Sequence, residues 1–381
     1  MQSRVLEQHI AVFGESGSGK TVLVSSFYGA TLEPQFLNNS LFDVVADDRS
    51  QHTFLHQNYL GMRNRAQPPA PTRFAAKSYS FSVKLRDNSE AAVKSRPFDA
   101  LRLVWHDYPG EWFEQDVDGE EEAQRRVDTF RSLLSSDVAL LLVDARKLLD
   151  HAGEEERYLK SLIANFHTGL LSIKDELLVD GKPLVEFPRI WMMALSKADL
   201  MPDMDTFKFR DLLTEKVGGD LDQLARVIAG LVEASDALSV AEDFVLLSSA
   251  KFEPGEIKVA ERVGLNLILP LAAILPFERH VRWNQTMQLP GKVAENLLSG
   301  ASTLAAALVA RKTRLPGPLG KVLNLVNPAL VNAAAKLAGD KLREMNAQAL
   351  ARQDHLAAVL TGCRIDLDRA EQDNVLYRSL K

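Results

Sequence analysis

An eight-residue segment near the N-terminus constrains this chain more than any other feature. Gly14, Glu15, Ser16, Gly17, Ser18, Gly19, Lys20 and Thr21 match the phosphate-loop pattern Gly-x-x-x-x-Gly-Lys-Ser/Thr in full. The segment follows an apolar run at residues 10–13 and precedes a helix-forming stretch, as a phosphate-binding loop requires. Its backbone N–H groups and the helix N-terminus favour anions. We expect Lys20 to bind the β- and γ-phosphates of a nucleotide and the Thr21 hydroxyl to bind Mg²⁺.

Short apolar runs alternate with helix-length segments over the first 250 residues. The runs are residues 9–13, 78–85, 101–105, 138–143, 190–195 and 244–247, and the helical segments include 20–28, 120–134, 154–178 and 207–234. Apolar runs separated by helices predict an α/β fold, a mostly parallel sheet flanked by helices. Residues 78–85 alternate apolar and polar side chains and lie close to the next run. They therefore predict an antiparallel hairpin at the sheet edge.

Composition places the chain in the globular class. Of 381 residues, 46% are hydrophobic and 25% are charged, which excludes a disordered, collagenous or coiled-coil chain. The net charge of −6 argues against a nucleic-acid partner. A single cysteine, Cys363, excludes a disulfide scaffold and a multi-cysteine metal site, and it fits a reducing compartment. No signal peptide or membrane-spanning stretch is recognisable, so we expect a cytoplasmic protein.

The C-terminal part differs in character from the rest. Residues 1–253 are expected to form the nucleotide-binding domain, 254–363 a helical region and 364–381 a charged tail. Residues 279–350 hold ten basic and three acidic side chains. Residues 293–310 read as an amphipathic helix, followed by Arg311, Lys312 and Arg314. Such a helix can contact an anionic membrane, here the inner membrane, or an acidic partner. The alternative is a helix packed on the nucleotide-binding domain with solvated basic side chains.

The segment after residues 101–106 narrows the class of nucleotide-binding protein. Asp107 ends that apolar run and Gly110 follows three residues later. The pair resembles the switch II motif Asp-x-x-Gly of TRAFAC-class GTPases. The resemblance implies that Asp107 holds Mg²⁺ through water and that the Gly110 N–H binds the γ-phosphate. Glu111 stands where many GTPases have the glutamine that orients the attacking water. A glutamate there brings a negative charge near the phosphate, so slow hydrolysis is expected.

Two further segments resemble the guanine-recognition motifs of the same class. Ser196-Lys197-Ala198-Asp199 resembles Asn/Thr-Lys-x-Asp, with Ser196 departing at the first position. The resemblance implies that Asp199 accepts hydrogen bonds from guanine N1 and N2 and that the Lys197 stem covers the base. Ser249-Ala250-Lys251 resembles the motif Ser-Ala-Lys. There the Ala250 N–H would meet the guanine O6, which an adenine base lacks.

Switch I is the least distinctive motif. In this class a threonine before the second strand binds Mg²⁺ and the γ-phosphate, and the resemblance gives this role to Thr72. Thr53 is an alternative candidate, and an ordinary loop threonine is another. Residues 32–70 would then form an insertion of the kind that serves as a lid or partner surface. Arg73 is the nearest candidate for a catalytic arginine, with a solvated surface arginine as the alternative.

The stretch 107–112, together with Pro69, Pro71, Thr72 and Arg73, resembles the YcjX-like family of bacterial P-loop NTPases. The resemblance implies a bacterial cytoplasmic GTPase that uses GTP, GDP and Mg²⁺. Two functions stay open. One is a slow GTP hydrolase that acts as a nucleotide-controlled switch for a protein partner, in a stress or conflict role. The other is nucleotide-dependent assembly on a membrane surface or a partner, with hydrolysis secondary.

Overall fold

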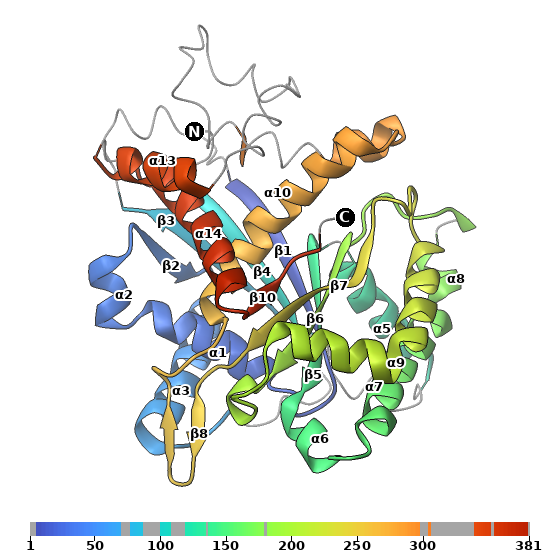
Figure 1. Ribbon diagram of the computed structural model, residues 1–381, viewed down its shortest axis with the longest axis horizontal. Helices are drawn as coiled ribbons and strands as arrows, with labels where there is room; N and C mark the ends of the chain where they lie inside the picture. Colours follow the sequence, from blue (N-terminus) through green and yellow to red (C-terminus); the bar gives the residue numbers. More distant parts are fainter. Residues whose placement is uncertain are drawn as a thin grey trace, which may run out of the picture.

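A central eight-stranded sheet organises the computed structural model (Figure 1). The structure describes residues 5–69, 77–86, 100–107, 119–134, 136–178, 181–297, 304–305, 339–351 and 354–379. The strands of the sheet are β1 (Val5–Phe13), β2 (Phe42–Ala46), β3 (Lys77–Leu85), β4 (Ala100–Asp107), β5 (Val138–Asp144), β6 (Ile190–Ser196), β7 (Ser239–Leu247) and β10 (Leu376–Tyr377). Their order is β10-β7-β6-β5-β1-β4-β3-β2. The five strands from β7 to β4 are parallel, and β2, β3 and β10 are antiparallel additions at the two edges.

Helices cover both faces of the sheet because successive side chains of a strand point to opposite faces. Ile10 and Val12 of β1 lie in one hydrophobic core, which α1, α10 and α14 complete. Ala11 and Phe13 lie in the other, which α5, α7 and α9 complete. These helices are α1 (Lys20–Thr31), α5 (Glu120–Leu133), α7 (Glu155–Ser172), α9 (Thr206–Ala229), α10 (Ile268–Thr286) and α14 (His355–Gln372).

The fold predicted from the sequence is confirmed. Each of the six apolar runs lies within a strand, and β3 pairs antiparallel with β4 as expected for an edge hairpin. The sheet is mostly parallel with flanking helices, and a helical region follows it toward the C-terminus. Among the described residues, no helix has the length and apolar content needed to cross a bilayer.

The predicted insertion at 32–70 is built from regular elements. It contains α2 (Pro34–Asn39), strand β2 and α3 (Arg49–Arg65), so it extends the sheet by one strand. The Asp48 side chain accepts hydrogen bonds from the N–H groups of Ser50 and Gln51 and so begins α3 with an N-cap. The five residues of β2 are too few to show a clear alternation in the sequence.

The C-terminal region packs on the sheet. The stretch 268–277 is buried throughout, and an all-apolar helix of this kind is stable only inside a core. Pro276 lies inside α10. The predicted boundary at 253 falls between the strands of a hairpin, β8 (Lys251–Glu253) and β9 (Glu256–Lys258), which projects from the lower edge in Figure 1.

Residues 364–379 of the expected charged tail pack against the rest of the fold. Its predicted start at 364 falls inside α14, and β10 follows and pairs with β7. Arg378 forms ion pairs with Glu278, Asp368 and Glu371 at distances of 2.6–2.9 Å. Charged side chains of the tail are therefore used to hold it against α10 and α14. Most of the amphipathic stretch expected at 293–310 lies outside the described residues.

Candidate functional site

The predicted phosphate loop joins β1 to α1 at the centre of the sheet edge. Gly17 and Gly19 have φ angles of +79° and +93°, in the left-handed region that favours glycine. Gly19 is the N-cap of α1, so the helix begins directly beneath the loop. The Lys20 Nζ donates to the carbonyl oxygens of Gly14 (2.7 Å) and Glu15 (3.0 Å). The lysine is thus held over the loop where a phosphate would lie.

Close packing surrounds the start of the loop. A Cβ atom at Gly14 would lie 2.7 Å from Ser18 Oγ and 3.0 Å from Leu142 Cβ, so only glycine fits. The Ser18 Oγ is buried and has no hydrogen-bond partner among the residues that the structure describes. A buried hydroxyl without a partner is typical of a site that a polar ligand completes.

Two of the three residues expected to hold Mg²⁺, Thr21 and Asp107, lie at or beside this loop. Asp107 is the last residue of β4 and is in register with Val12 of β1, one residue before β1 ends. Its carboxylate is therefore beside the start of the phosphate loop, and it is 7% exposed. Thr21 lies in the first turn of α1. A carboxylate and a hydroxyl oxygen at one place suit Mg²⁺, which prefers hard oxygen ligands.

The lysine of the Ser196–Asp199 segment lies against the phosphate loop. Lys197 has a φ of +56°, and its Cε is 3.9 Å from the position of a Cβ on Gly19. Its Nζ lies 2.6 Å from Asp144 Oδ2. Asp144 ends β5, and its other oxygen accepts from the Arg146 N–H at the start of α6 (Ala145–Asp150). The carboxylate is 2% exposed, so this pair fixes the lysine stem firmly.

Asp199, the acid of the same segment, is held by Ser248, a contact that the sequence did not predict. The Ser248 Oγ donates to Asp199 Oδ1 over 2.7 Å, and the Phe252 N–H lies 3.4 Å from Oδ2. Ser196 instead donates to the Val143 carbonyl (3.2 Å) and ties β6 to β5. The one signal for Ser248 in the sequence is its position immediately before Ser249.

The predicted Ser249–Lys251 motif follows β7 at the same sheet edge. Ser249 and Ala250 are buried, and Ala250 packs with Tyr59 and Met62 of α3. Lys251 begins β8 and pairs with Glu253 (3.1 Å) on the hairpin. The structure therefore brings the phosphate loop, Ser196–Asp199 and Ser249–Ala250 to one edge of the sheet. The Lys251 side chain instead forms an ion pair within the β8–β9 hairpin.

A second ion pair beside the loop was not predicted. Lys147 of α6 lies 2.6 Å from Glu15 Oε2 and 5.8 Å from the centre of the Tyr158 ring. Helix α6 thus contacts the phosphate loop through Lys147. Asp144, the residue before α6, contacts the Ser196–Asp199 segment through Lys197. The acidic and basic residues directly after the buried run 138–143 are the only sequence signal for this arrangement.

Several predicted site residues lie outside the described residues, namely Thr72, Arg73, Gly110 and Glu111. Thr53, the alternative switch I threonine, is an exposed residue of α3, and its hydroxyl donates to the Arg49 carbonyl of the same helix (2.9 Å). The structure thus uses the Thr53 hydroxyl within its own helix.

A histidine pair borders the expected metal carboxylate. His106 precedes Asp107, and one ring nitrogen lies 2.9 Å from His9 Nδ1 while the other lies 2.9 Å from Ser78 Oγ. Burial lowers the pKa of His106 to about 4. The imidazole is neutral at pH 7, so it places no positive charge beside Asp107 to compete with a cation.

Comparison with known families supports the class that this site indicates. Residues 8–179 match the family model Double-GTPase 2, less than half of the chain. The match includes the phosphate loop and Asp107 and ends before Ser196. Together, these findings support a P-loop protein of the GTPase class that binds guanine nucleotide. They do not confirm the resemblance to the YcjX-like family.

Solved structures give weaker likenesses, and no curated protein matches the chain. The signal recognition particle receptor SRb-GTP/SRX complex from Chaetomium thermophilum is 15% identical over 65% of this chain and 92% of its own, with a TM-score of 0.32. Methanosarcina barkeri Roco2 RocCORdC bound to GDP is 12% identical over 88% and 68%, with a TM-score of 0.27. The GTP-bound S. cerevisiae Ski7 GTPase-like domain is 13% identical over 64% and 43%, with a TM-score of 0.30. All three TM-scores are below 0.5, so the fold rests on the strand order above.

Proposed function

We propose that the chain binds GTP with Mg²⁺, hydrolyses it slowly to GDP and phosphate, and acts as a nucleotide-controlled switch for a protein partner. The observation that carries this proposal is the proximity of two motifs that are far apart in the sequence. The stem of Lys197 lies 3.9 Å from a Cβ position on Gly19, so base-reading and phosphate-binding segments are neighbours.

Each residue has a role that follows from its place. The loop N–H groups and Lys20 bind and orient the phosphates. Thr21, Asp107 and, from its position in the sequence, Thr72 would hold Mg²⁺, which neutralises charge on the phosphate oxygens when bound. The Gly110 N–H would bind the γ-phosphate. Glu111 would accept a proton from the attacking water, but its own charge near the phosphate keeps the rate low.

Base selectivity is assigned to Asp199, with Lys197 covering the base and the Ala250 N–H meeting guanine O6. A carboxylate that accepts from both N1–H and the N2 amino group forms a charge-assisted bidentate pair. Adenine has neither donor in this arrangement, and unpaired polar groups would remain in the site. GTP should therefore bind at least about a hundredfold more tightly than ATP, a difference of roughly 2.7 kcal/mol.

The test is the base preference of Asp199→Asn. An amide donates where guanine also donates, so the variant should lose GTP binding and gain binding of xanthosine triphosphate, whose position 2 carries an oxygen. Labelled GTP, ATP and xanthosine triphosphate are titrated side by side. Asp203→Asn, an exposed acid four residues further on, is the matched control and should keep the GTP preference. Equal GTP and ATP affinity in the wild type would overturn the proposal.

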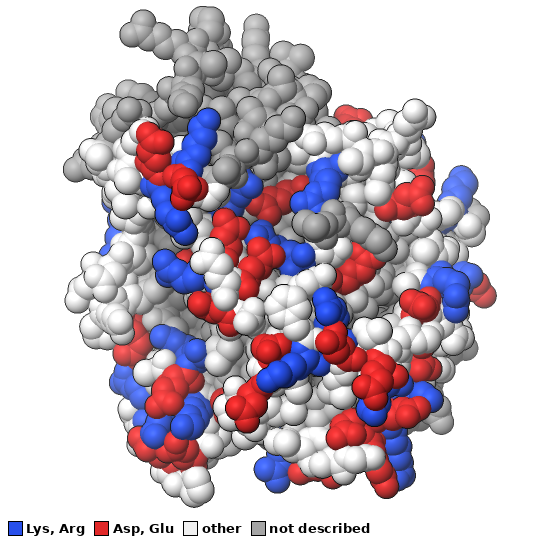
Figure 2. Space-filling model, in the orientation of Figure 1, with Lys and Arg blue, Asp and Glu red and all other residues white. Residues whose placement is uncertain are grey.

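A second candidate is nucleotide-dependent assembly or scaffolding on a membrane or a partner in a bacterial stress or conflict role. It is favoured by the ten basic and three acidic side chains at residues 279–350, which suit a cytoplasmic protein peripheral to the inner membrane. On the face drawn in Figure 2, basic and acidic side chains are interspersed. Co-sedimentation with anionic vesicles at low salt tests this candidate. If the protein does not bind the vesicles at low salt, assembly on a membrane is excluded.

A further inference from the structure

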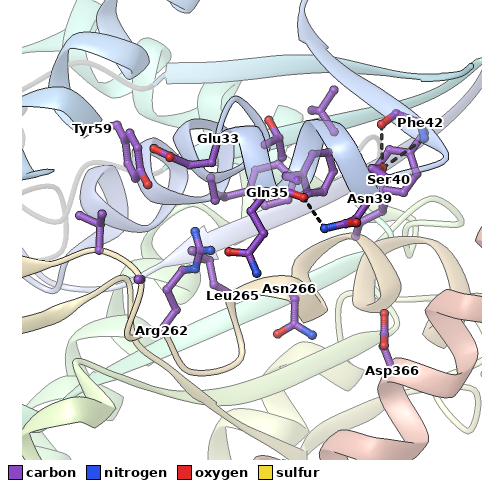
Figure 3. A pocket seen from close by; sticks show the side chains of 18 of the residues that line it. Glu33, Gln35, Asn39, Ser40, Phe42, Tyr59, Arg262, Leu265, Asn266 and Asp366 are labelled. Carbon is purple, nitrogen blue, oxygen red and sulfur yellow. Dashed lines mark hydrogen bonds between the residues drawn. The ribbon is translucent and has the colours of Figure 1, made fainter.

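A large groove lies between the insertion and the C-terminal helices, away from the phosphate loop. It has a volume of about 1090 Å³. Its walls come from α1, α2 and α3 on one side, and from α14 and the segment 256–270, which includes η4 (Leu265–Leu267), on the other. Figure 3 shows Gln35 and Asn39 on one wall facing Asn266 and Asp366 on the other. Cavities for small ligands are about 300–1,000 Å³, so this groove can hold a larger group.

The groove has an apolar floor and a regular helical wall. Phe27, Phe36, Phe42, Leu265 and Leu269 contribute aromatic and aliphatic surface. The α14 wall is made by Val359, Gly362, Cys363 and Asp366, which have the i, i+3, i+4, i+7 spacing of one helix face. A carboxylate therefore ends a stripe that is otherwise small and apolar.

Charged side chains of the groove differ in whether they have partners. Glu33 is paired with Arg63, with 2.5 Å between Oε1 and Nη1. Asp366 and Arg262 each make no hydrogen bond or ion pair with any residue that the structure describes. Arg262 is exposed and solvated, whereas Asp366 is half-buried. Burial raises the pKa of Asp366, partly offset by the charge of Arg369. A cationic side chain in the groove would gain most at Asp366, because this half-buried carboxylate has no ionic partner among the described residues, whereas Glu33 is already paired with Arg63.

The walls also favour one shape of occupant. Most of the lining residues lie on helices, whose backbone groups are used within the helix, so only the short strands β2 and β9 and the loops beside them remain to pair with an extended peptide. A helical peptide satisfies its own backbone and lays an apolar face on an apolar floor. Amide side chains at the rim, Gln35, Asn39 and Asn266, suit the polar flank of such a helix.

We propose that this groove binds an amphipathic helix of a partner protein, whose apolar face covers the floor and whose Lys or Arg reaches Asp366. The inference rests on the proposed switch function, since it specifies the chemistry of the partner. The insertion and α14 both contact the helix, so the partner would hold together two segments that are far apart in the sequence.

The experiment is a selection of short random peptides displayed on phage against the full-length protein, with and without GTP. Sequences that bind the wild type are counter-selected on Asp366→Lys. The enriched peptides should carry apolar residues at i, i+3 and i+4 and a Lys or Arg at the end of that face. Their affinity should fall at least about tenfold in Asp366→Lys, because a like charge replaces the attraction. Peptides with that Lys changed to Glu should regain affinity for the variant.

Controls separate the groove from folding and from nucleotide binding. Asp373→Lys makes the same charge change on an exposed residue just beyond α14 and should leave peptide affinity unchanged. Asp366→Asn, which keeps the shape of the side chain, should weaken binding if Asp366→Lys fails to fold. All variants should bind GTP as the wild type does, so failure of GTP binding in the wild type would count against the switch and not against the groove.

Three results would overturn the proposal. The first is no enrichment on the wild type relative to Asp366→Lys. The second is enriched peptides that bind both proteins equally. The third is self-association of the wild type that Asp366→Lys abolishes, since a second copy of the chain would then occupy the groove.

Discussion

Asp144 is a buried carboxylate whose effect on the nucleotide would be transmitted through Lys197. The change Asp144→Asn keeps a side-chain oxygen to cap α6 but removes the charge opposite Lys197 Nζ. We expect the lysine stem to lose its fixed position and GTP affinity to fall by about tenfold, roughly 1.4 kcal/mol. Titration with labelled GTP measures this.

The matched control lies at the other end of the same helix. Asp150 is exposed and pairs with Arg146, so Asp150→Asn should leave GTP affinity unchanged. If Asp144→Asn binds GTP as tightly as the wild type, Lys197 does not depend on this carboxylate.

His280 of α10 gives the protein a predictable sensitivity to acid. Burial lowers its pKa from 6.5 to about 4, and the charges of Arg189 and Arg279 add to the effect. Between these two values the unfolded chain takes up a proton that the folded chain does not, so stability falls as the pH decreases from 6.5 to 4. The loss is up to about 1.4 kcal/mol per pH unit for one histidine. Above pH 6.5 the contribution is constant.

The change His280→Gln should remove that contribution while keeping an N–H donor for the Leu297 carbonyl. Urea unfolding at pH 7 and at pH 5 measures the free energy in both proteins. The variant should lose less stability than the wild type on acidification. Equal losses in the two proteins would show that the pKa of His280 is not lower in the folded protein than in the unfolded chain.

At the scale of elements, one buried ion pair joins α10 to β7. Arg279 Nη2 lies 2.7 Å from Asp243 Oδ1, and both side chains are almost fully buried. Asp243 also accepts from the Ser239 hydroxyl (2.9 Å) and the Ser379 N–H (2.8 Å), so α10, β7 and the C-terminal segment meet at this carboxylate. Burial raises its pKa, and the charge of Arg279 opposes that shift.

Removing the arginine should be strongly destabilising. Arg279→Met leaves a buried charge without its main partner, for an expected loss of about 3–5 kcal/mol in the free energy of unfolding. The double change Arg279→Met with Asp243→Leu should recover much of it, because no buried charge remains. Arg343→Met, at an exposed pair with Asp340, is the control and should change stability by less than about 0.5 kcal/mol. If Arg279→Met and Arg343→Met lowered the free energy of unfolding equally, this account would be contradicted.

At the scale of the whole molecule, the C-terminal region belongs to the same core as the nucleotide-binding strands. Large apolar side chains of α10 contribute about 1.5–3 kcal/mol each when buried. Six of them, Ile268, Leu269, Leu271, Ile274, Leu275 and Phe277, lie in the core on one face of the sheet. Their sum is comparable to the entire stability of a domain, about 5–15 kcal/mol.

A chain that ends at Glu253 should therefore fail to fold. It lacks α10, α14 and β10 and cuts the β8–β9 hairpin in half. We expect the full chain to unfold in one cooperative transition and the shortened chain to show none by circular dichroism. A shortened chain that melts cooperatively and binds GTP would instead support the predicted boundary at 253.

Local sequence properties determined the phosphate loop, the main strands and the class of fold. Glycine conformations at Gly17 and Gly19 and the apolar run before them depend on a few neighbouring residues, so they can be inferred without the rest of the chain. The parallel pairing of the main strands also follows from their helical connections, whereas the order of the strands in the sheet does not. Short pairings such as β2 and β10 carry too little signal, because their stability comes from the neighbour they extend.

Only the tertiary structure decided which side chains support the motifs. Ser248 holds Asp199, Asp144 holds Lys197 and Lys147 pairs with Glu15, and each pair joins segments well separated along the chain. The groove beside Asp366 likewise exists because the insertion and α14 pack near one another. Such contacts depend on strand register and helix packing, which are set by the whole core at once. A sequence specifies that core, but no local pattern within it reports which distant side chains will meet.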